Sequence, residues 1–316
     1  MPYFHIPVLS KEVIEIVDPM PGENLVDGTL GGGGHAGLFL EKISPDGKLL
    51  GIDLDDEALS ESRKSLGKYS DRIILKKGNF VDFVNIVKEH NFQNINIFFL
   101  DLGFSSQQLK SNSVGISFLK EAPLDMRIGG ISEDGDNKIS AEDIVNNYKE
   151  EKIKLIIKEY GEERYATLIA REIIKVRKES RIVNTQQLVD LISKVVPEKY
   201  KKQKIHFATK TFQALRIAVN SELENLEIVL PQILDNIETG GRIAIISFHS
   251  LEDRIVKRFF QKESKDCICD LKVPVCNCGH KKRLEILTKK PIQAKEKEIL
   301  SNSRARSAKL RIAKKI

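Results

Sequence analysis

The sequence contains no apolar run that approaches the length of a membrane span. Crossing a bilayer as a helix takes about 18 or more consecutive apolar residues, and the most apolar stretches here are the short segments NINIFFL and RIAII. The N-terminal segment MPYFHIPVLSKEVIE has a lysine and acids where a signal peptide would need an unbroken apolar core. These absences exclude a membrane protein and predict a soluble, cytoplasmic one.

Cysteine is also scarce. All four cysteines lie between Cys267 and Cys278, which excludes a mini-protein stapled by disulfides, and a cytoplasmic setting keeps thiols reduced. Their pattern is C-x-C-x6-C-x-C, whereas usual zinc sites separate paired cysteines by two to four residues. We therefore predict no metal site. Four thiolates could still enclose an ion, so the role of Cys267, Cys269, Cys276 and Cys278 stays open on the sequence alone.

What the sequence does contain is enough apolar material for a sizeable core. Its 316 residues are 41% hydrophobic, which suits two domains or one large domain with an insertion. The charge is unevenly distributed. Residues 279–316 hold 13 Lys and Arg against 3 Glu, a surplus of ten within a net charge of +6, so residues 1–278 carry −4. A basic C-terminal segment of this kind is expected where a polyanion binds.

Strand and helix patterns alternate in the first hundred residues. Short apolar runs at 24–27, 48–53, 72–75 and 96–101 each end at a turn or an acid, and helical spacing separates them. This alternation predicts an α/β fold with a doubly wound, Rossmann-like parallel sheet.

The alternation stops after the fourth run. From about Ser140, which forms a capping box with Asp143, to Leu230 the pattern is helix after helix, and a strand pattern returns at 242–247. We therefore predict a helical domain inserted into the sheet. Residues 1–109 and 211–316 form the discontinuous sheet domain in this interpretation, and residues 110–210 form the insertion.

A glycine-rich segment, DGTLGGGGHAG, follows the first predicted strand. Gly32, Gly34 and Gly37 satisfy the G-x-G-x-x-G pattern, and Asp53 ends the next strand 20 residues after Gly33. Glycines allow a ligand close to the backbone, and a carboxylate at that strand end can accept both ribose hydroxyls. The pattern indicates an adenosine-containing cofactor. The alternative is a tight turn in which Asp53 only caps the following helix.

The cofactor can be narrowed further. No Gly-Lys-Ser/Thr follows the glycines, which excludes a P-loop and leaves a nicotinamide dinucleotide or S-adenosylmethionine. Asp27 ends the first strand, where a carboxylate would repel a pyrophosphate and attract the cationic methionine end of S-adenosylmethionine. Phe80 either stacks on the adenine ring or packs in the core. The fourth strand runs into a polar turn, DLGFSSQQL, that begins at Asp101, where a methyl acceptor would lie.

Eight motifs in order resemble the bacterial 16S ribosomal RNA cytosine-N4 methyltransferases over nearly the whole chain. They are HIPVL (5–9), DGTLGGGGH (27–35), GIDLD (51–55), DLGFSSQQL (101–109), PLDMR (123–127), TFQALRIAVN (211–220), GGRIAIISFHSLEDR (240–254) and RSAKLR (306–311). Two positions depart from the family pattern. Ile116-Ser117-Phe118 stands where Phe-Ser-Phe is usual, and His206-Phe207-Ala208 stands where His-Pro-Ala is usual.

The resemblance implies a class I methyltransferase fold and methyl transfer from S-adenosylmethionine to the exocyclic N4 amine of one cytidine in the decoding region of 16S rRNA. On the family pattern the cofactor-binding residues are Gly33, Gly34, His35, Asp53, Phe80, Asp101 and Gln108.

Candidates for catalysis follow from the chemistry of the amine. Its lone pair is delocalised into the cytosine ring, so an acceptor must draw on an N–H. Asp101 and Asp125 are the candidates. Asp101 could instead serve the cofactor alone, and Asp125 could form only a surface salt bridge with Arg127. His249 either reaches the site or packs in the core, and Ser250 with Asp253 is expected to form a capping box.

The expected partner is 16S rRNA or the small ribosomal subunit. Phosphate contacts are assigned to the basic C-terminal segment and to Lys199, Lys201, Lys202 and Lys204. Two rival functions remain at this point, a nicotinamide-dependent oxidoreductase and a ribosome-assembly factor that binds RNA without turnover. The exact nucleotide, the choice between naked RNA and assembled subunit, and the oligomeric state are open.

Overall fold

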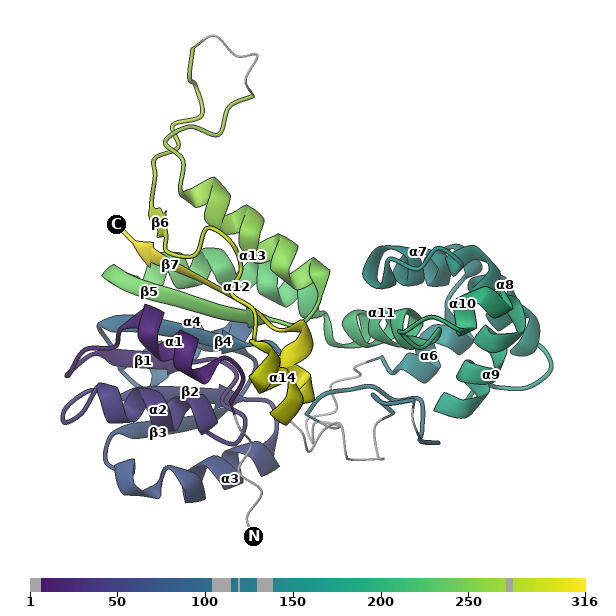
Figure 1. Ribbon diagram of the computed structural model, residues 1–316, viewed down its shortest axis with the longest axis horizontal. Coiled ribbons are helices and arrows are strands. Elements are labelled where there is room, and N and C mark those ends of the chain that lie inside the picture. Colours follow the sequence, from purple (N-terminus) through teal and green to yellow (C-terminus); the bar gives the residue numbers. More distant parts are fainter. Residues whose placement is uncertain (1–6, 104–114, 119, 130–138, 271–274) are drawn as a thin grey trace. The chain divides into compact units, whose positions relative to one another are not determined.

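A seven-stranded sheet organises the residues that the computed structural model describes, which are 7–103, 115–118, 120–129, 139–270 and 275–316 (Figure 1). Its strands are β1 (Asn24–Asp27), β2 (Leu49–Asp53), β3 (Ile73–Lys77), β4 (Ile95–Asp101), β5 (Ile237–Ser247), β6 (Leu284–Ile286) and β7 (Lys309–Lys315). The order across the sheet is β3-β2-β1-β4-β5-β7-β6, with β1 to β5 parallel and β7 antiparallel to both neighbours. The predicted α/β, doubly wound fold is confirmed.

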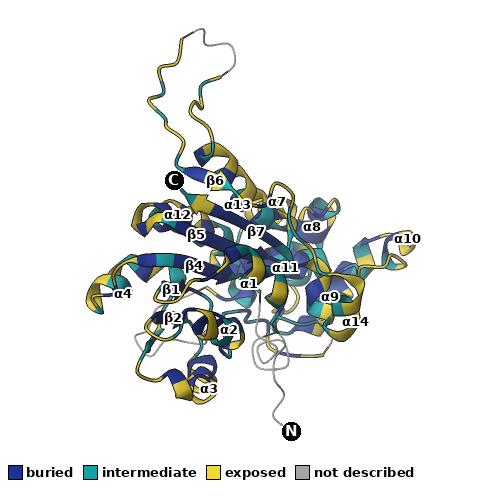
Figure 2. Ribbon diagram, turned by 60° about the vertical axis from the view of Figure 1, so that its left-hand side comes forward, coloured by how far each residue is buried: buried dark blue, intermediate teal, exposed yellow. Residues whose placement is uncertain are grey.

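Each strand of the central sheet sends alternate side chains into one of two cores. On β4, Ile97 and Phe99 join one core while Phe98 and Leu100 join the other. Burial on both faces explains why the predicted strands are continuous apolar runs, and the strands are accordingly buried in Figure 2. The sheet is thus held as a rigid platform whose strand ends can carry polar groups.

Helices cover both faces. Helices α1 (Ser10–Val17), α2 (Gly34–Lys42) and α3 (Asp56–Ser65) contribute to the core that contains Phe99. Helices α4 (Phe83–Glu89), α12 (Glu222–Asn236) and α13 (Ser250–Glu263) contribute to the core that contains Phe98. The remaining short helical elements of this part are η1 (Gly67–Tyr69), η2 (Phe80–Asp82), α14 (Glu296–Ser301) and η3 (Ser303–Ser307). None of the described helices is both long and apolar enough to cross a membrane.

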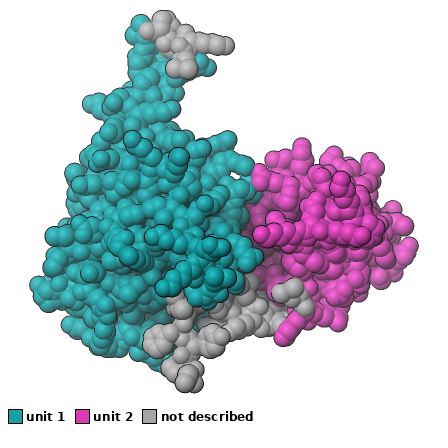
Figure 3. All heavy atoms as spheres, in the orientation of Figure 1, with its two compact units in different colours: residues 1–103, 223–316 teal, residues 104–222 magenta. Residues whose placement is uncertain are grey.

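The chain divides into two compact units, shown in different colours in Figure 3. Unit 1 comprises residues 1–103 and 223–316 and contains the sheet. Unit 2 comprises residues 104–222 and is helical in its described part. Its helices are α6 (Ala141–Asn147), α7 (Glu150–Gly161), α8 (Ala166–Val176), α9 (Thr185–Val195), α10 (Glu198–Lys201) and α11 (Thr209–Asn220).

Both unit boundaries differ from the predicted ones at 110 and 211. The second differs because α11 belongs with the helices rather than with the sheet. Phe212, Ala214 and Leu215 are buried in the unit 2 core, and the main chain of α7 comes so close that a Cβ added to Gly161 would lie 2.5 Å from the carbonyl oxygen of Lys210. The predicted capping box at the start of α6 is confirmed, with Ser140 and Asp143 bonded reciprocally.

Candidate active site

Three strands end in an aspartate at the carboxyl edge of the sheet. β1 ends at Asp27, β2 at Asp53 and β4 at Asp101. The strand order reverses between β1 and β4, and open α/β sheets bind their ligands at such a switch point. The three carboxyl groups are close enough that the charges of Asp101 and Asp53 both act on Asp27. The topology therefore concentrates acidic groups at the position where a ligand is expected.

The glycine segment between β1 and α2 turns sharply at this edge. Gly31 and Gly33 adopt the left-handed backbone region, with φ of 53° and 79°, which glycine enters without a steric penalty. A Cβ on Gly33 would also come within 3.1 Å of the hydroxyl oxygens of Ser62 and Ser65. Gly33 is thus required by both conformation and space, while Gly34 and His35 begin α2.

Helix α3 fixes this loop from the side. The Ser62 hydroxyl donates to the carbonyl of Gly31 (2.7 Å), and the Ser65 hydroxyl donates to the carbonyl of Gly32 (3.0 Å). Two carbonyls of the glycine loop are therefore held by α3.

Asp53 orders the same loop from the end of β2. Its Oδ2 accepts from the backbone N–H of Gly31 (2.7 Å), and its Oδ1 accepts from the N–H of Asp55 (3.0 Å). Asp53 therefore does stabilise the turn before α3, as the alternative interpretation of the sequence had it. Each carboxylate oxygen has a second lone pair, so the same group can still accept from ribose hydroxyls. Burial raises the pKa of Asp53, and the bonds from Asp55 and Gly31 oppose that shift.

Asp27 is buried at the end of β1. Its side chain is 1% exposed, and burial raises its pKa to about 8, with the charges of Asp101 and Asp53 adding to the shift. In the ligand-free protein burial therefore favours the protonated form, a nearby cation would favour the carboxylate, and attraction of a cationic ligand by Asp27 stays a prediction. Its Oδ1 accepts from the N–H of Thr29 (3.1 Å), which places it in the architecture of the loop.

Asp101 is connected to the loop and to α2. Its backbone N–H donates to the Thr29 hydroxyl (2.6 Å), and its Oδ2 lies 3.8 Å from Nδ1 of His35. The other ring nitrogen, Nε2, lies 2.9 Å from the carbonyl of Val8. A carbonyl only accepts, so Nε2 carries the ring proton, and burial lowers the pKa of His35. The neutral ring therefore turns a lone pair, not a proton, toward Asp101.

Comparison with known proteins gives a single answer. The MraW methylase family model matches residues 2–316. Proteins named ribosomal RNA small subunit methyltransferase H are 46% identical in Syntrophotalea carbinolica, over 99% of this chain and 98% of the relative, and 46% identical in Geobacter sulfurreducens, over 100% of both. The relative of that name in Heliobacterium mobile is 45% identical over 100% of both chains. The chain belongs to the MraW methylase family.

This methylase uses S-adenosylmethionine, and the residues at the sheet edge fit that cofactor. The loop after β1 offers close backbone approach at Gly31 and Gly33, and Asp53 retains acceptor capacity at the end of β2. A carboxylate acceptor suits the two ribose hydroxyls of an adenosine. The nicotinamide-dependent oxidoreductase considered above is excluded by the family.

Phe80 borders the glycine loop of the methylase. It is half-buried against the core that contains Phe98, and its Cβ lies 3.0 Å from where a side chain at Gly28 would begin. That same added Cβ would lie 2.7 Å from a terminal methyl carbon of Leu100, so a larger residue at position 28 would have to displace this side chain. Phe80 therefore packs in the core, as one of the two interpretations had it. Stacking of its ring on the adenine of the cofactor stays a prediction. Gln108 lies outside the described residues, as do Ser105 and Ser106 of the polar turn.

The beginning of the polar turn after β4 is held by the end of β5. The N–H of Leu102 donates to the carbonyl of Ile246 (3.0 Å). A Cβ on Gly103 would lie 2.6 Å from the Phe248 ring, so the ring covers this glycine. The backbone at 102–103 is fixed in position next to Asp101.

His249 is committed to the start of α13, and the predicted capping box of Ser250 with Asp253 is wrong. The box is formed by His249 and Glu252. The His249 Nδ1 accepts from the N–H of Glu252 (3.4 Å), and the Glu252 carboxylate accepts from the N–H of His249 (3.2 Å). Asp253 instead binds Arg311 of β7, whose Nε donates to Oδ1 (2.6 Å).

Asp125 and Arg127 lie in unit 2 and bind each other. The Arg127 Nε donates to Oδ1 of Asp125 (2.7 Å), and Nη2 donates to Oδ2 (2.6 Å). Their side chains are only 24% and 17% exposed, so the pair is better shielded from water than the surface salt bridge considered from the sequence. The bond to Asp125 raises the pKa of Arg127. Both carboxylate oxygens of Asp125 are therefore engaged by Arg127.

The lysines assigned to phosphate contacts have different environments. Lys199 and Lys202 lie in or next to α10 and are exposed, as is Lys204 beyond it. Lys201 binds Glu198 (2.6 Å). In the C-terminal segment Lys289 and Lys290 are exposed, whereas Arg311 is buried in its pair with Asp253.

Sequence reasoning missed several residues that shape this edge. Burial lowers the pKa of Arg304, in η3, while the negative charge of Asp101 opposes that shift. Glu298 accepts from the N–H of Leu9 (2.7 Å) and so ties α14 to the HIPVL segment. In the sequence, the only sign that the C-terminal residues contribute to this edge was RSAKLR, one of the eight motifs shared with the family. The bonds of the Thr29 and Ser62 hydroxyls could not be anticipated, because their partners are distant in sequence.

Proposed function

We propose that this methylase transfers a methyl group to the exocyclic N4 amine of a cytidine in the decoding region of 16S rRNA. The full-length relatives are named for the small ribosomal subunit, and the eight sequence motifs match the cytosine-N4 pattern. The observation that carries the proposal is the position of Asp101. It ends β4 at the switch point of the sheet and leads directly into the polar turn.

The methyl donor supplies a methyl group that is already activated by its bond to a sulfonium sulfur. The task left to the protein is to orient the amine, exclude water and take up a proton. In our proposal Gly33, Gly34, His35 and Asp53 hold the donor, with Phe80 and Gln108 completing that site. Asp53 accepts from the ribose hydroxyls through the lone pairs that Gly31 and Asp55 do not use.

Asp101 has the second role. An N–H of the cytosine amine donates to its carboxylate, which returns electron density to nitrogen as the new N–C bond forms, and Asp101 then holds the released proton. The neutral His35 ring supports this role because it provides no competing proton. The carbonyls of Leu102 and Gly103, fixed by β5, are the further acceptors available for the amine. Asp125 is the second candidate, and it would have to release Arg127 first.

A cytidine in RNA must be unpaired or turned outward before its amine can enter such a site. We therefore infer that the acceptor is a single-stranded loop, with phosphates bound by Lys199, Lys202 and the exposed lysines of the C-terminal segment.

The direct test is methyl transfer in vitro with labelled S-adenosylmethionine. Purified small subunits, naked 16S rRNA and large subunits are offered in parallel, and the product nucleoside is identified by chromatography and mass spectrometry. We expect N4-methylcytidine in small-subunit RNA alone. Label in large-subunit RNA, or a methyl group on another atom, would contradict the proposal. RNA binding without transfer would favour the assembly-factor alternative.

A further inference from the structure

The segment between α13 and β6 lacks the apolar packing that holds the rest of unit 1. It extends away from the sheet in Figure 1, and none of its described residues between Ser264 and Arg283 belongs to a hydrophobic core. Val275 is 76% exposed and Ile268 is 41% exposed. Its base is attached to α13, because the N–H of Arg283 donates to the Glu263 carbonyl (2.8 Å). Something other than apolar burial must order the outer part.

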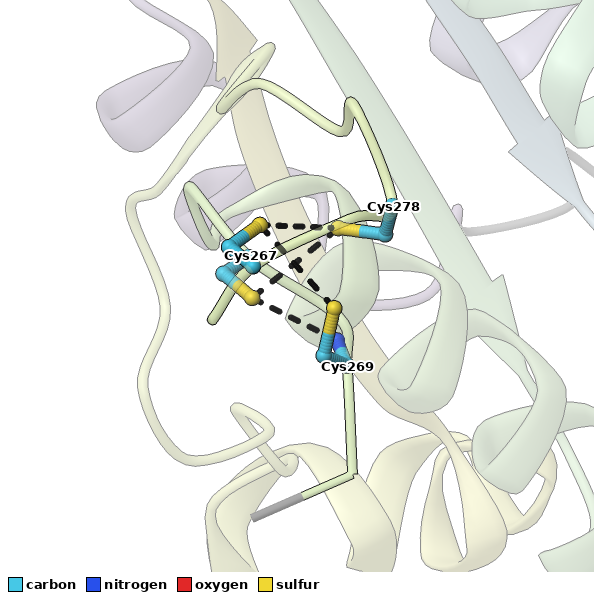
Figure 4. A group of neighbouring side chains, drawn as sticks. Cys267, Cys269 and Cys278 are labelled. Atoms are coloured by element: carbon cyan, nitrogen blue, oxygen red, sulfur yellow. Dashed lines mark hydrogen bonds between the residues drawn. The ribbon is translucent and has the colours of Figure 1, made fainter. Parts of the chain in front are cut away.

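Four sulfur atoms converge in this outer part. All four lie within 4.8 Å of one another. Cys267 and Cys278 are 3.9 Å apart, Cys276 and Cys278 are 3.6 Å apart, and Cys269 and Cys276 are 3.9 Å apart. The labelled side chains in Figure 4 point toward one another. Because a tetrahedral zinc ion with bonds of about 2.3 Å to sulfur holds its four sulfurs about 3.8 Å apart, these spacings match that geometry.

The C-x-C spacing is compatible with this arrangement once both sides of the segment, 267–269 and 276–278, contribute. Residues two apart in an extended chain share a face, so each pair can turn both sulfurs inward from its own side. Two backbone N–H groups support the sulfurs, from Cys269 to Cys267 (3.4 Å) and from Ile268 to Cys278 (3.5 Å). Such bonds orient and stabilise thiolate ligands. The spacing alone had left open whether all four thiolates enclose an ion, and the convergence of the sulfurs supplies what the spacing lacked.

We propose that Cys267, Cys269, Cys276 and Cys278 bind one Zn²⁺ ion, which closes the segment between α13 and β6. Four protein ligands leave no open position, so the site is structural rather than catalytic. Binding converts four thiols to zinc-bound thiolates and releases their protons to solvent. The ion takes the place of the missing apolar core and orders the exposed residues Lys281 and Lys282 that follow it.

The test measures metal content of the full chain, purified under reducing conditions, loaded with zinc chloride and dialysed. Inductively coupled plasma mass spectrometry should find about one equivalent of zinc per wild-type chain. The double variant Cys276→Ser/Cys278→Ser should retain less than about a tenth of an equivalent. Val275→Ser is the matched control, since this neighbouring exposed side chain has no sulfur. Replacement by Co²⁺ should give the intense visible bands of a tetrahedral thiolate complex in the wild type and the control only.

A second measurement avoids any folding defect of the cysteine variant. Trypsin cleavage after Lys281 and Lys282 is followed in wild-type protein with zinc and after removal of zinc by a chelator, and zinc should slow cleavage severalfold. Absence of retained zinc in the wild type, equal retention by the double variant, iron in place of zinc, or cleavage that is indifferent to the metal would each overturn the proposal.

Discussion

Asp27 shows how strongly burial can change the meaning of a residue. The fully buried group has a pKa raised to about 8, whereas in an unfolded chain an aspartate titrates near about 3.9. Between these two values the folded protein keeps a proton that the unfolded chain has lost. Its stabilising effect is therefore complete below about pH 4 and is lost as pH rises through about 8.

This linkage predicts the behaviour of Asp27→Asn. The amide keeps an acceptor for the N–H of Thr29 and cannot ionise. From pH 5 to pH 8 the ligand-free variant should gain stability relative to the wild type, by up to about 4 kcal/mol at 1.4 kcal/mol for each pH unit. Urea denaturation of both proteins at several pH values measures the difference. A difference independent of pH would show that Asp27 has an ordinary pKa.

Asp53→Ala should weaken binding of S-adenosylmethionine and of its demethylated product alike. Loss of a charged acceptor for the ribose hydroxyls corresponds to about 1.5–3 kcal/mol, roughly 10- to 150-fold in affinity. Calorimetry measures both ligands. Asp53→Asn is the matched control, because its amide oxygen can still hold either Gly31 or Asp55. Unchanged affinity in the alanine variant would remove Asp53 from the cofactor site.

Asp101→Asn separates the two roles considered for Asp101. If the carboxylate takes up the amine proton, turnover at saturating cofactor should fall by about 100-fold or more, with cofactor affinity changed much less. Single-turnover rates give the measurement, and calorimetry gives the affinity. Turnover restored by saturating cofactor would end the catalytic role and direct attention to Asp125 and the carbonyls of Leu102 and Gly103.

Residues at strand ends were accessible to sequence reasoning because a strand and the acid that closes it are adjacent in the chain. Asp53 and Asp101 were found in this way, and the structure brings them to one edge. Ser62 and Arg304 were not, since their contributions depend on how α3 and η3 pack against residues far away in sequence. The raised pKa of Asp27 could not be anticipated for a related reason, because burial cannot be read from a strand end alone.

Strands β6 and β7 lie outside the alternating pattern of strands and helices that predicted the sheet. β7 reads KLRIAKK, with basic residues at positions that the predicted strands fill with apolar ones, yet Leu310, Ile312 and Ala313 are buried. Basic side chains are accommodated by specific partners, above all Asp253 for Arg311. β5 was predicted from 242 but begins at Ile237, because Gly240 and Gly241 resemble a turn.

The Arg311–Asp253 pair joins β7 to α13, and its side chains are 8% and 13% exposed. Without Arg311 the Asp253 carboxylate keeps only its longer contact with Lys309 (3.7 Å), so Arg311→Met should destabilise unit 1 by about 1.5–3 kcal/mol. Lys314→Met on the same strand is the control, because Lys314 is exposed and should change stability by less than about 0.5 kcal/mol. Denaturant midpoints of the two variants provide the comparison. Equal midpoints would mean that the pair adds nothing to the attachment of β7.

At the scale of the whole molecule, the basic C-terminal segment cannot be treated as a free tail. A chain shortened after Thr288 would lose β7 from within the sheet, so charge reversal is the better test of RNA contact. Lys289→Glu/Lys290→Glu should reduce the slope of log affinity against log salt by about 1.4 if each lysine neutralises one phosphate of single-stranded RNA.

Lys42→Glu/Lys88→Glu is the control for the same change in net charge, with both lysines exposed on α2 and α4. The salt dependence of RNA binding by filter retention measures both double variants. A slope that falls equally in the two would indicate a general charge effect, and an unchanged slope in both would show that Lys289 and Lys290 face solvent.

The discontinuity of unit 1 has a consequence for synthesis of the chain. β4 ends at Asp101, and its parallel partner β5 begins 136 residues later, at Ile237. At about 5–20 residues per second, a nascent β4 waits roughly 7–27 seconds with one edge unpaired. Unit 2 is contiguous and can fold during that interval. The apolar strands of the sheet are therefore at risk of aggregation while the ribosome is still translating the rest of the chain.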